Sequence, residues 1–353
     1  MSRSHFTHIP TLSGLRGLAA LMVLFSHAEH YGYLNIPFGK GLRKIGVELF
    51  YVLSGFLISG LYANTEFSTN HVRNYVAARL ARVLPLFYTA LLCGVALLLV
   101  FGHSGYSFGD IYSFFQNVLL LKGTGVLWSV PVEIQYYALF ILIWGAWKHQ
   151  WGLGFIFVIS ALQVLLIFLL LNRLGDENYL FFWVHFFLIG FILAQIWRNN
   201  SAKVSEFCSK SLVVYILSFI AISASIALLP WLRELMSFQL PPIFIDPFVI
   251  ISIVISFMFT LFGRGPYAIL GHPIMRRLGD WSFGIYLIHA PFIFLADGFK
   301  LKERLGATPA LFLVLLTTIA TAALARAIIE VPIGRQMRKY LSTQTSVPVQ
   351  STT

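Results

Sequence analysis

The sequence predicts an all-α integral membrane protein with about ten transmembrane helices in a single bundle. Of its 353 residues, 58% are hydrophobic and only 11% are charged, whereas soluble proteins carry roughly 25% charged residues. The apolar residues gather in runs of about 20, the length that an α-helix needs to cross the hydrocarbon core of a bilayer. Because no stretch between these runs is long enough for a soluble domain, the chemistry is expected among the helices or at their ends.

Ten apolar runs follow one another along the chain. The predicted spans are 12–30, 46–63, 84–102, 126–147, 152–171, 179–197, 211–229, 247–263, 281–296 and 309–329. The ninth is short and carries polar residues. We expect residues 1–340 to form one membrane domain, followed by a polar, disordered cytoplasmic tail over 341–353, which is rich in Ser, Thr and Gln.

The net charge of +11 has a topological explanation. An excess of 25 Lys and Arg over 14 Asp and Glu would suggest a nucleic-acid partner in a soluble protein. In membrane proteins, however, the cytoplasmic loops concentrate Lys and Arg. Placing both termini in the cytoplasm puts the larger share of these residues inside. We therefore expect a multi-pass protein of the cytoplasmic (inner) membrane, in contact with membrane lipid and without a nucleic-acid partner. The first span is expected to remain in place, because Arg16 interrupts the approach to a signal-peptide-like run.

The first span carries two ionisable residues on one face. Arg16 and His27 lie 11 positions apart, which at 100° per residue is only about 20° from three whole turns, and separates them by about 16–17 Å along the axis. Arg16 alone could be a terminal residue that reaches the membrane surface, and His27 alone could bind a neighbouring helix. Their shared face favours a common cavity.

The other ionisable residues of the spans fall into two depth layers. Each costs about 2.5–3.5 kcal/mol in the membrane on insertion scales, so its presence needs a reason. The outer layer contains His27, Glu48, Glu133 and His289. The inner layer contains Arg16, Arg79, Arg82, Asp280 and Glu330.

The two layers predict different chemistry. Inner arginines suit phosphates, because planar guanidinium groups bind them through paired hydrogen bonds; ordinary cytoplasmic charge is the alternative. A histidine beside carboxylates is a general-base arrangement, with a polar cluster that fixes helix packing as the alternative. Tyr286 and His289 lie three residues apart and are predicted to line the same cavity. Asp280 and Glu330 could instead be structural partners of the arginines.

We predict no metal site and no permanently bound cofactor. The two cysteines, Cys93 and Cys208, form no metal-ligand pattern, and the pair His27 and His30 lacks the spacing of a helical zinc motif. Ser54 and Ser129 are possible covalent relays in principle, but neither lies in the Gly-x-Ser-x-Gly turn that exposes a catalytic serine.

Six blocks, in order, resemble the acyltransferase 3 family of multi-pass membrane acyltransferases. They are Leu12-Ser-Gly-Leu-Arg-Gly-Leu-Ala-Ala, Gly46-Val-Glu-Leu-Phe-Tyr-Val-Leu-Ser-Gly-Phe-Leu-Ile, Arg79-Leu-Ala-Arg-Val-Leu-Pro-Leu-Phe-Tyr, Leu127-Trp-Ser-Val-Pro-Val-Glu-Ile-Gln-Tyr-Tyr, Gly279-Asp-Trp-Ser-Phe-Gly-Ile-Tyr-Leu-Ile-His-Ala-Pro and Glu330-Val-Pro. Arg16 and His27 correspond to the family's hallmark arginine–histidine pair. Arg79 and Arg82 correspond to its paired arginines.

The resemblance implies an O-acyltransferase. Its donor would be an acyl-coenzyme A, most often acetyl-CoA, and its acceptor a sugar hydroxyl in an envelope polysaccharide, lipopolysaccharide, exopolysaccharide or lipid-linked glycan. We expect Arg16, Arg79 and Arg82 to hold the coenzyme phosphates. His27 would be the general base, oriented by Glu48 or Glu133.

Two other functions are compatible with the residues alone. A proton-coupled secondary transporter would also contain buried carboxylates, a histidine and a helix interrupted by proline. A catalytically inactive membrane scaffold would tolerate replacement of Arg16 and His27 in every assay except assembly.

Overall fold

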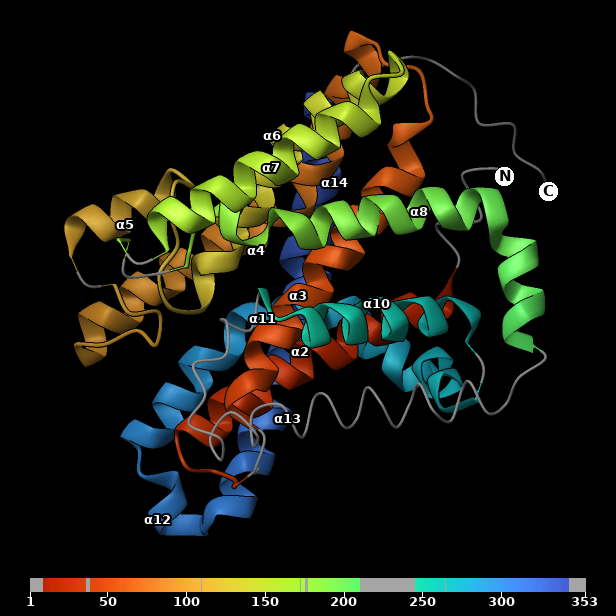
Figure 1. The fold of residues 1–353 in the computed structure, drawn as a ribbon. Helices are drawn as coiled ribbons and strands as arrows, with labels where there is room; N and C mark the ends of the chain where they lie inside the picture. Colours follow the sequence, from red (N-terminus) through yellow and green to blue (C-terminus); the bar gives the residue numbers. More distant parts are fainter. Residues whose placement is uncertain are drawn as a thin grey trace, which may run out of the picture.

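The computed structural model describes residues 9–342 except 36–38, 109, 172, 175–176, 210–244 and 264, and it is a helical bundle (Figure 1). These described ranges contain helices and no strand. The prediction of an all-α membrane protein is confirmed, since eight of the described helices are long and apolar enough to cross a membrane.

The membrane-length elements follow the predicted order. They are α2 (Pro10–His30), α3 (Gly39–Ile58) with a π-helical end (Ser59–Ala63), α4 (Thr69–Phe101), α6 (Ser129–Lys148) after a 3-10 turn (Gly125–Trp128), α7 (Gly152–Leu170), α8 (Leu180–Ser209), α11 (Pro273–Gly298), and α13 (Ala307–Ala325), which continues through a π-helical turn (Arg326–Glu330) into α14 (Val331–Leu341). The shorter helices are α5 (Ile111–Val118), α10 (Pro247–Phe262) and α12 (Leu301–Leu305). The predicted span 247–263 is the 16-residue α10, and 211–229 lies outside the described residues. The count of ten therefore stays a prediction.

Helix α4 begins 15 residues before the predicted span 84–102 and is 33 residues long. Hydropathy reports only the part of a helix that lies in hydrocarbon, whereas the backbone can continue as a helix through a polar, basic segment. As a result Arg79 and Arg82 belong to the helix itself and lie three residues apart on it, on neighbouring positions of its surface.

Helix α2 lies at the centre, between α3 and α11, and glycines bring α2 and α11 very close together. A Cβ atom added to Gly279 would lie 1.7 Å from the carbonyl oxygen of Ser13, and one added to Gly17 would lie 2.8 Å from the backbone nitrogen of Gly279. Small residues at such contacts allow transmembrane backbones to pack closely. This contact fixes the register of α2 against α11, and thus the position of His27 relative to His289.

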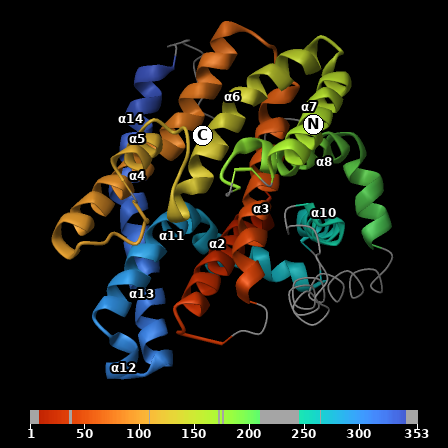
Figure 2. The ribbon, with the colours of Figure 1, turned by 60° about the vertical axis from the view of Figure 1, so that its left-hand side comes forward.

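The outer helices present apolar side chains where lipid is expected. On α7, Phe168 is 83% exposed and Phe157 is 73% exposed. Figure 2 shows α13 and α14 as one continuous rod beside α4. In contrast, the interior between α3, α6 and α8 is filled by aromatic rings, including Tyr51, Trp144 and Trp183. The functional site lies between this aromatic core and α2.

Candidate active site

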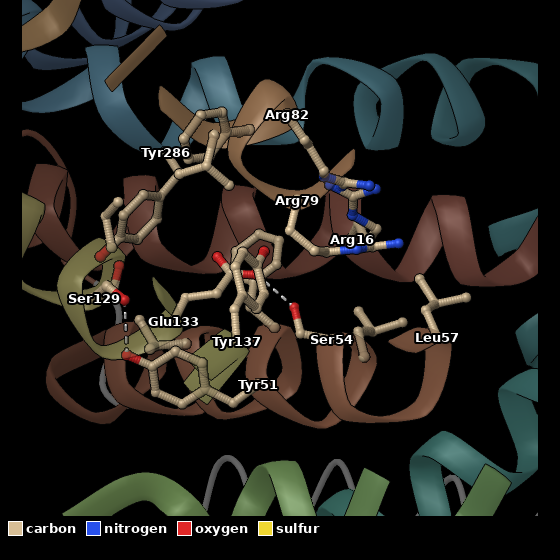
Figure 3. A pocket seen from close by; sticks show the side chains of 16 residues that line it. Arg16, Tyr51, Ser54, Leu57, Arg79, Arg82, Ser129, Glu133, Tyr137 and Tyr286 are labelled. Atoms are coloured by element: carbon tan, nitrogen blue, oxygen red, sulfur yellow. Dashed lines mark hydrogen bonds between the residues drawn. The ribbon is translucent and has the colours of Figure 1, made fainter. Parts of the chain in front are cut away.

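A narrow cavity of about 60 Å³ lies between α2, α3, α4, α6 and α11. Its polar lining residues are Arg16, Tyr51, Ser54, Arg79, Arg82, Ser129, Glu133, Tyr137 and Tyr286. Figure 3 shows the three arginines gathered at one end, Ser129 and Tyr286 at the other, and Glu133 between them. We call this space the central cavity.

The arginine end of the central cavity gathers three positive charges that form no close ion pair within the described chain. Arg16, Arg79 and Arg82 are all half-buried, and no carboxylate of the described chain lies within 4.0 Å of any of them. The Cζ atom of Arg79 lies 5.6 Å from the ring centroid of Tyr62, and the guanidinium also forms a hydrogen bond with the Tyr62 side chain. Three guanidinium groups gathered in this way are costly unless an anion joins them. The structure thus brings together the three predicted coenzyme-binding residues, while their role stays a prediction.

Glu133 occupies the middle of the cavity and receives two hydroxyl groups. The Ser54 hydroxyl and the Tyr137 hydroxyl each donate to Oε1 of Glu133 at 2.7 Å. Hydrogen bonds of this kind stabilise the charged carboxylate. Sequence reasoning missed Tyr137, although its position four residues after Glu133 on one helix indicates the contact.

The two predicted histidines are neighbours. Nε2 of His289 lies 3.2 Å from Nδ1 of His27, and the ring centroids are 4.9 Å apart. Nδ1 of His27 also lies 2.9 Å from the carbonyl oxygen of Val23, and Nδ1 of His289 lies 3.1 Å from that of Ile285. A carbonyl oxygen only accepts hydrogen bonds, so both Nδ1 atoms carry the hydrogen. His289 then accepts through Nε2, and Nε2 of His27 keeps its lone pair.

The contacts of Nδ1 of His27 are with groups other than the predicted carboxylates, and the orienting role of Glu48 or Glu133 stays a prediction. The partners of its Nδ1 are the Val23 carbonyl and His289, whereas Glu133 binds Ser54 and Tyr137 in the central cavity. His289 is fully buried and lines none of the cavities described in this section. It lies behind His27 as its hydrogen-bond partner. Glu48 is also fully buried, on α3, and its catalytic role stays a prediction.

A second cavity of about 420 Å³, which we call the vestibule, opens beside His27. Its lining includes His27, Arg43, Lys44, Trp128, Glu177, Asn178 and Trp183. Tyr286 and Val47 line both the vestibule and the central cavity. These two side chains therefore form the wall between the arginine cavity and the space beside His27. The prediction for Tyr286, a position in the substrate cavity, agrees with this geometry.

Asp280 and Glu330 both contact Arg326, an arginine outside the central cavity. Nη2 of Arg326 lies 3.8 Å from Oδ1 of Asp280, and Nη1 lies 3.2 Å from Oε1 of Glu330. Nη1 also donates to the backbone carbonyl of Asp280 at 2.8 Å. These contacts join α11 to the π-helical turn after α13, which agrees with the structural alternative for both carboxylates.

Comparison with known proteins places these residues in a family context. A family model described as an acyltransferase domain matches residues 9–326. The O-acetyltransferase OatA of Staphylococcus aureus strain NCTC 8325 is 25% identical over 361 residues, covering 93% of this chain and 58% of the relative. The protein of the same name from strain MRSA252 gives the same values. The chain thus spans 58% of the length of these curated relatives. No solved structure matches it.

Proposed function

Because the chain belongs to the acyltransferase family whose domain covers residues 9–326, we propose that it is a membrane O-acetyltransferase. It transfers an acetyl group from cytoplasmic acetyl-CoA to a hydroxyl of a sugar in an envelope or exported glycan, or in a lipid-linked sugar. The observation that carries this proposal is the arrangement of three unpaired arginines and a histidine base on opposite sides of one wall, Tyr286 with Val47.

The arginine end is suited to the donor. Arg16, Arg79 and Arg82 face one cavity from two helices, and guanidinium groups are good ligands for phosphates. Arg16 and His27 are about 16–17 Å apart along α2, a distance comparable to the reach of an extended pantetheine arm. A coenzyme whose phosphates bind the arginines would therefore bring its thioester to the wall. This orientation requires the arginine end and both termini to be cytoplasmic in the inner membrane, in agreement with the loop charges.

The histidine pair is suited to activating the acceptor. The acceptor hydroxyl gives its proton to Nε2 of His27, and its oxygen attacks the thioester carbonyl carbon. The carbon–sulfur bond then breaks, and the coenzyme thiolate leaves and takes up the proton. His289 keeps the imidazole in the required tautomer. The hydroxyls of Tyr286 and Ser129, which lie beside one another at the wall, are placed to stabilise the oxyanion, the charge that builds up during attack.

The direct test uses the full chain in lipid nanodiscs. Acetyl-CoA with a labelled acetyl group is supplied with defined oligosaccharides, and the labelled sugar is identified by mass spectrometry. We expect transfer by the wild-type protein and a loss of about 10²–10⁴-fold in His27→Ala, the usual contribution of a positioned base. Arg304→Gln, a change at an exposed residue that lines neither cavity, serves as the matched control.

The alternative functions make opposite predictions. Movement of a substrate across vesicles without any acetylated product would contradict the proposal and favour a transporter, an interpretation that neither the family nor the relatives support. A scaffold would leave His27→Ala indistinguishable from wild type in transfer as well.

A further inference from the structure

The vestibule has a chemical composition that the transfer reaction alone does not explain. Apart from His27 and the wall residues, it combines two tryptophans with an ion pair, an amide and an arginine. Aromatic side chains form one part of the lining, and groups that make strong hydrogen bonds form another. A ligand that fits both parts needs an apolar face and polar edges.

The aromatic part is rigid. The rings of Trp128 and Trp183 have centroids 5.0 Å apart, and Tyr51 packs edge-on against both, at 6.3 and 6.0 Å. Trp183 is 1% exposed, whereas Trp128 is only partly buried, and both line the vestibule. The ring contacts with Trp183 and Tyr51 restrict the orientation of Trp128. A fixed indole plane favours a flat apolar partner at low entropic cost.

The polar part is also held in place. Nζ of Lys44 lies 2.6 Å from Oε2 of Glu177, and the indole nitrogen of Trp183 donates to the backbone carbonyl of Glu177 at 2.6 Å. The ion pair is about 28% exposed at both side chains, so it is open to the cavity. Nδ2 of Asn178 donates weakly to the Gly123 carbonyl at 3.4 Å. A carboxylate accepts from hydroxyls and an ammonium group donates to them, so this pair can bind two adjacent hydroxyls.

We propose that the vestibule is a saccharide subsite. One pyranose ring packs its C–H face on Trp128, two of its hydroxyls bind the Lys44–Glu177 pair, and a further hydroxyl points at Nε2 of His27. This assignment rests on the proposed function, and it adds the place of the sugar ring and the residues that hold it. The cavity volume of about 420 Å³ has room for a sugar ring, unlike the central cavity of about 60 Å³.

The test compares sugar binding and transfer in tryptophan variants. The full chain in nanodiscs receives cellopentaose, chitopentaose, mannopentaose and, as a non-sugar alcohol, octanol. For any pentasaccharide that binds, we expect Trp128→Ala to raise KM about tenfold, the loss of roughly one stacking contact, with kcat and the KM for acetyl-CoA little changed. Trp128→Phe retains an aromatic face and should recover much of the loss. Trp151→Ala removes a tryptophan that is 76% exposed and lines neither cavity, and we expect no effect.

Binding is measured separately, by isothermal titration calorimetry with each pentasaccharide added without acetyl-CoA. A signal in wild type that disappears in Trp128→Ala supports the subsite. An unchanged KM in Trp128→Ala, no binding of any pentasaccharide, or better acetylation of octanol than of the sugars would overturn it. Sugar binding without any acetyl transfer would leave the subsite standing and contradict the proposed function, so the two failures are distinguishable.

Discussion

His289 offers the sharpest test of the proposed base, because its contact with His27 can be removed without removing the base itself. The perturbation is His289→Leu, which fills a similar volume but accepts no hydrogen bond. The contact that it deletes is the 3.2 Å bond between Nδ1 of His27 and Nε2 of His289. Nδ1 of His27 keeps its 2.9 Å bond to the Val23 carbonyl, so the tautomer with a free Nε2 survives.

The expected magnitude follows from what is lost and what is kept. One net hydrogen bond contributes about 0.5–1.5 kcal/mol, which corresponds to a fall in kcat of roughly two- to tenfold. Loss of the base in His27→Ala removes about 10²–10⁴-fold. The KM for acetyl-CoA should not change in His289→Leu, because the arginines lie across the wall. His289→Gln, whose side-chain oxygen can still accept, should recover most of the activity.

The assay is steady-state transfer from labelled acetyl-CoA in nanodiscs, at protein amounts matched by fluorescence-detected size exclusion. Thermal unfolding of each variant separates a loss of orientation from a loss of fold. If His289→Leu were as inactive as His27→Ala with an unchanged unfolding temperature, the proton would have to pass through His289. Assignment of a purely orienting role to His289 would then be wrong.

Three further predictions concern other parts of the site and the fold. Arg79→Gln should weaken coenzyme A binding about tenfold and reduce its dependence on salt, as measured by isothermal titration calorimetry; equal affinity would remove this arginine from the donor site. Ser54→Ala and Tyr137→Phe each delete one 2.7 Å bond to Glu133, so each should lower transfer activity, and their combined effect should depart from additivity because they share one acceptor. Strict additivity in a double-mutant cycle would argue against a coupled cluster. Gly279→Ala should lower the unfolding temperature, because its Cβ would lie 1.7 Å from the Ser13 carbonyl oxygen, whereas Gly154→Ala on α7 meets no atom within 4 Å and should be neutral; equal unfolding temperatures would contradict the packing argument.

Hydropathy was sufficient to predict most of the fold. Apolar runs report burial in hydrocarbon directly, so the membrane-length helices of the described chain lie where the runs are. Hydropathy could not predict that α4 begins at Thr69, because a helical segment outside the hydrocarbon can consist of polar residues. The close contact at Gly17 and Gly279 was equally invisible, since it depends on which faces of two distant helices meet.

The site was predictable within single helices and not between them. The shared face of Arg16 and His27 follows from helical periodicity alone. In contrast, His27 and His289 lie 262 positions apart, and Lys44 and Glu177 lie 133 apart. The predicted depth in the membrane limited the candidate partners of His27 to the outer layer, which also contains Glu48, Glu133 and His289. Which of these residues His27 contacts depends on how the helices pack. This is why the sequence pointed to the carboxylates as partners of His27, whereas the fold places His289 at hydrogen-bond distance from it.

The unequal sizes of the two cavities limit what can cross between them. The central cavity is narrow, at about 60 Å³, so a donor that reaches from the arginines to the wall has to widen it. Its wall, Tyr286 with Val47, is held on one side by the ring of Phe50, 6.0 Å from that of Tyr286. In the proposed function, each methylene added to the acyl group would have to open further space in this packed interior, at a cost of about 1–3 kcal/mol. In the proposed function, the same wall would separate water in the vestibule from the thioester and so suppress hydrolysis of the donor. Preference for acetyl and protection of the donor would then have one structural cause.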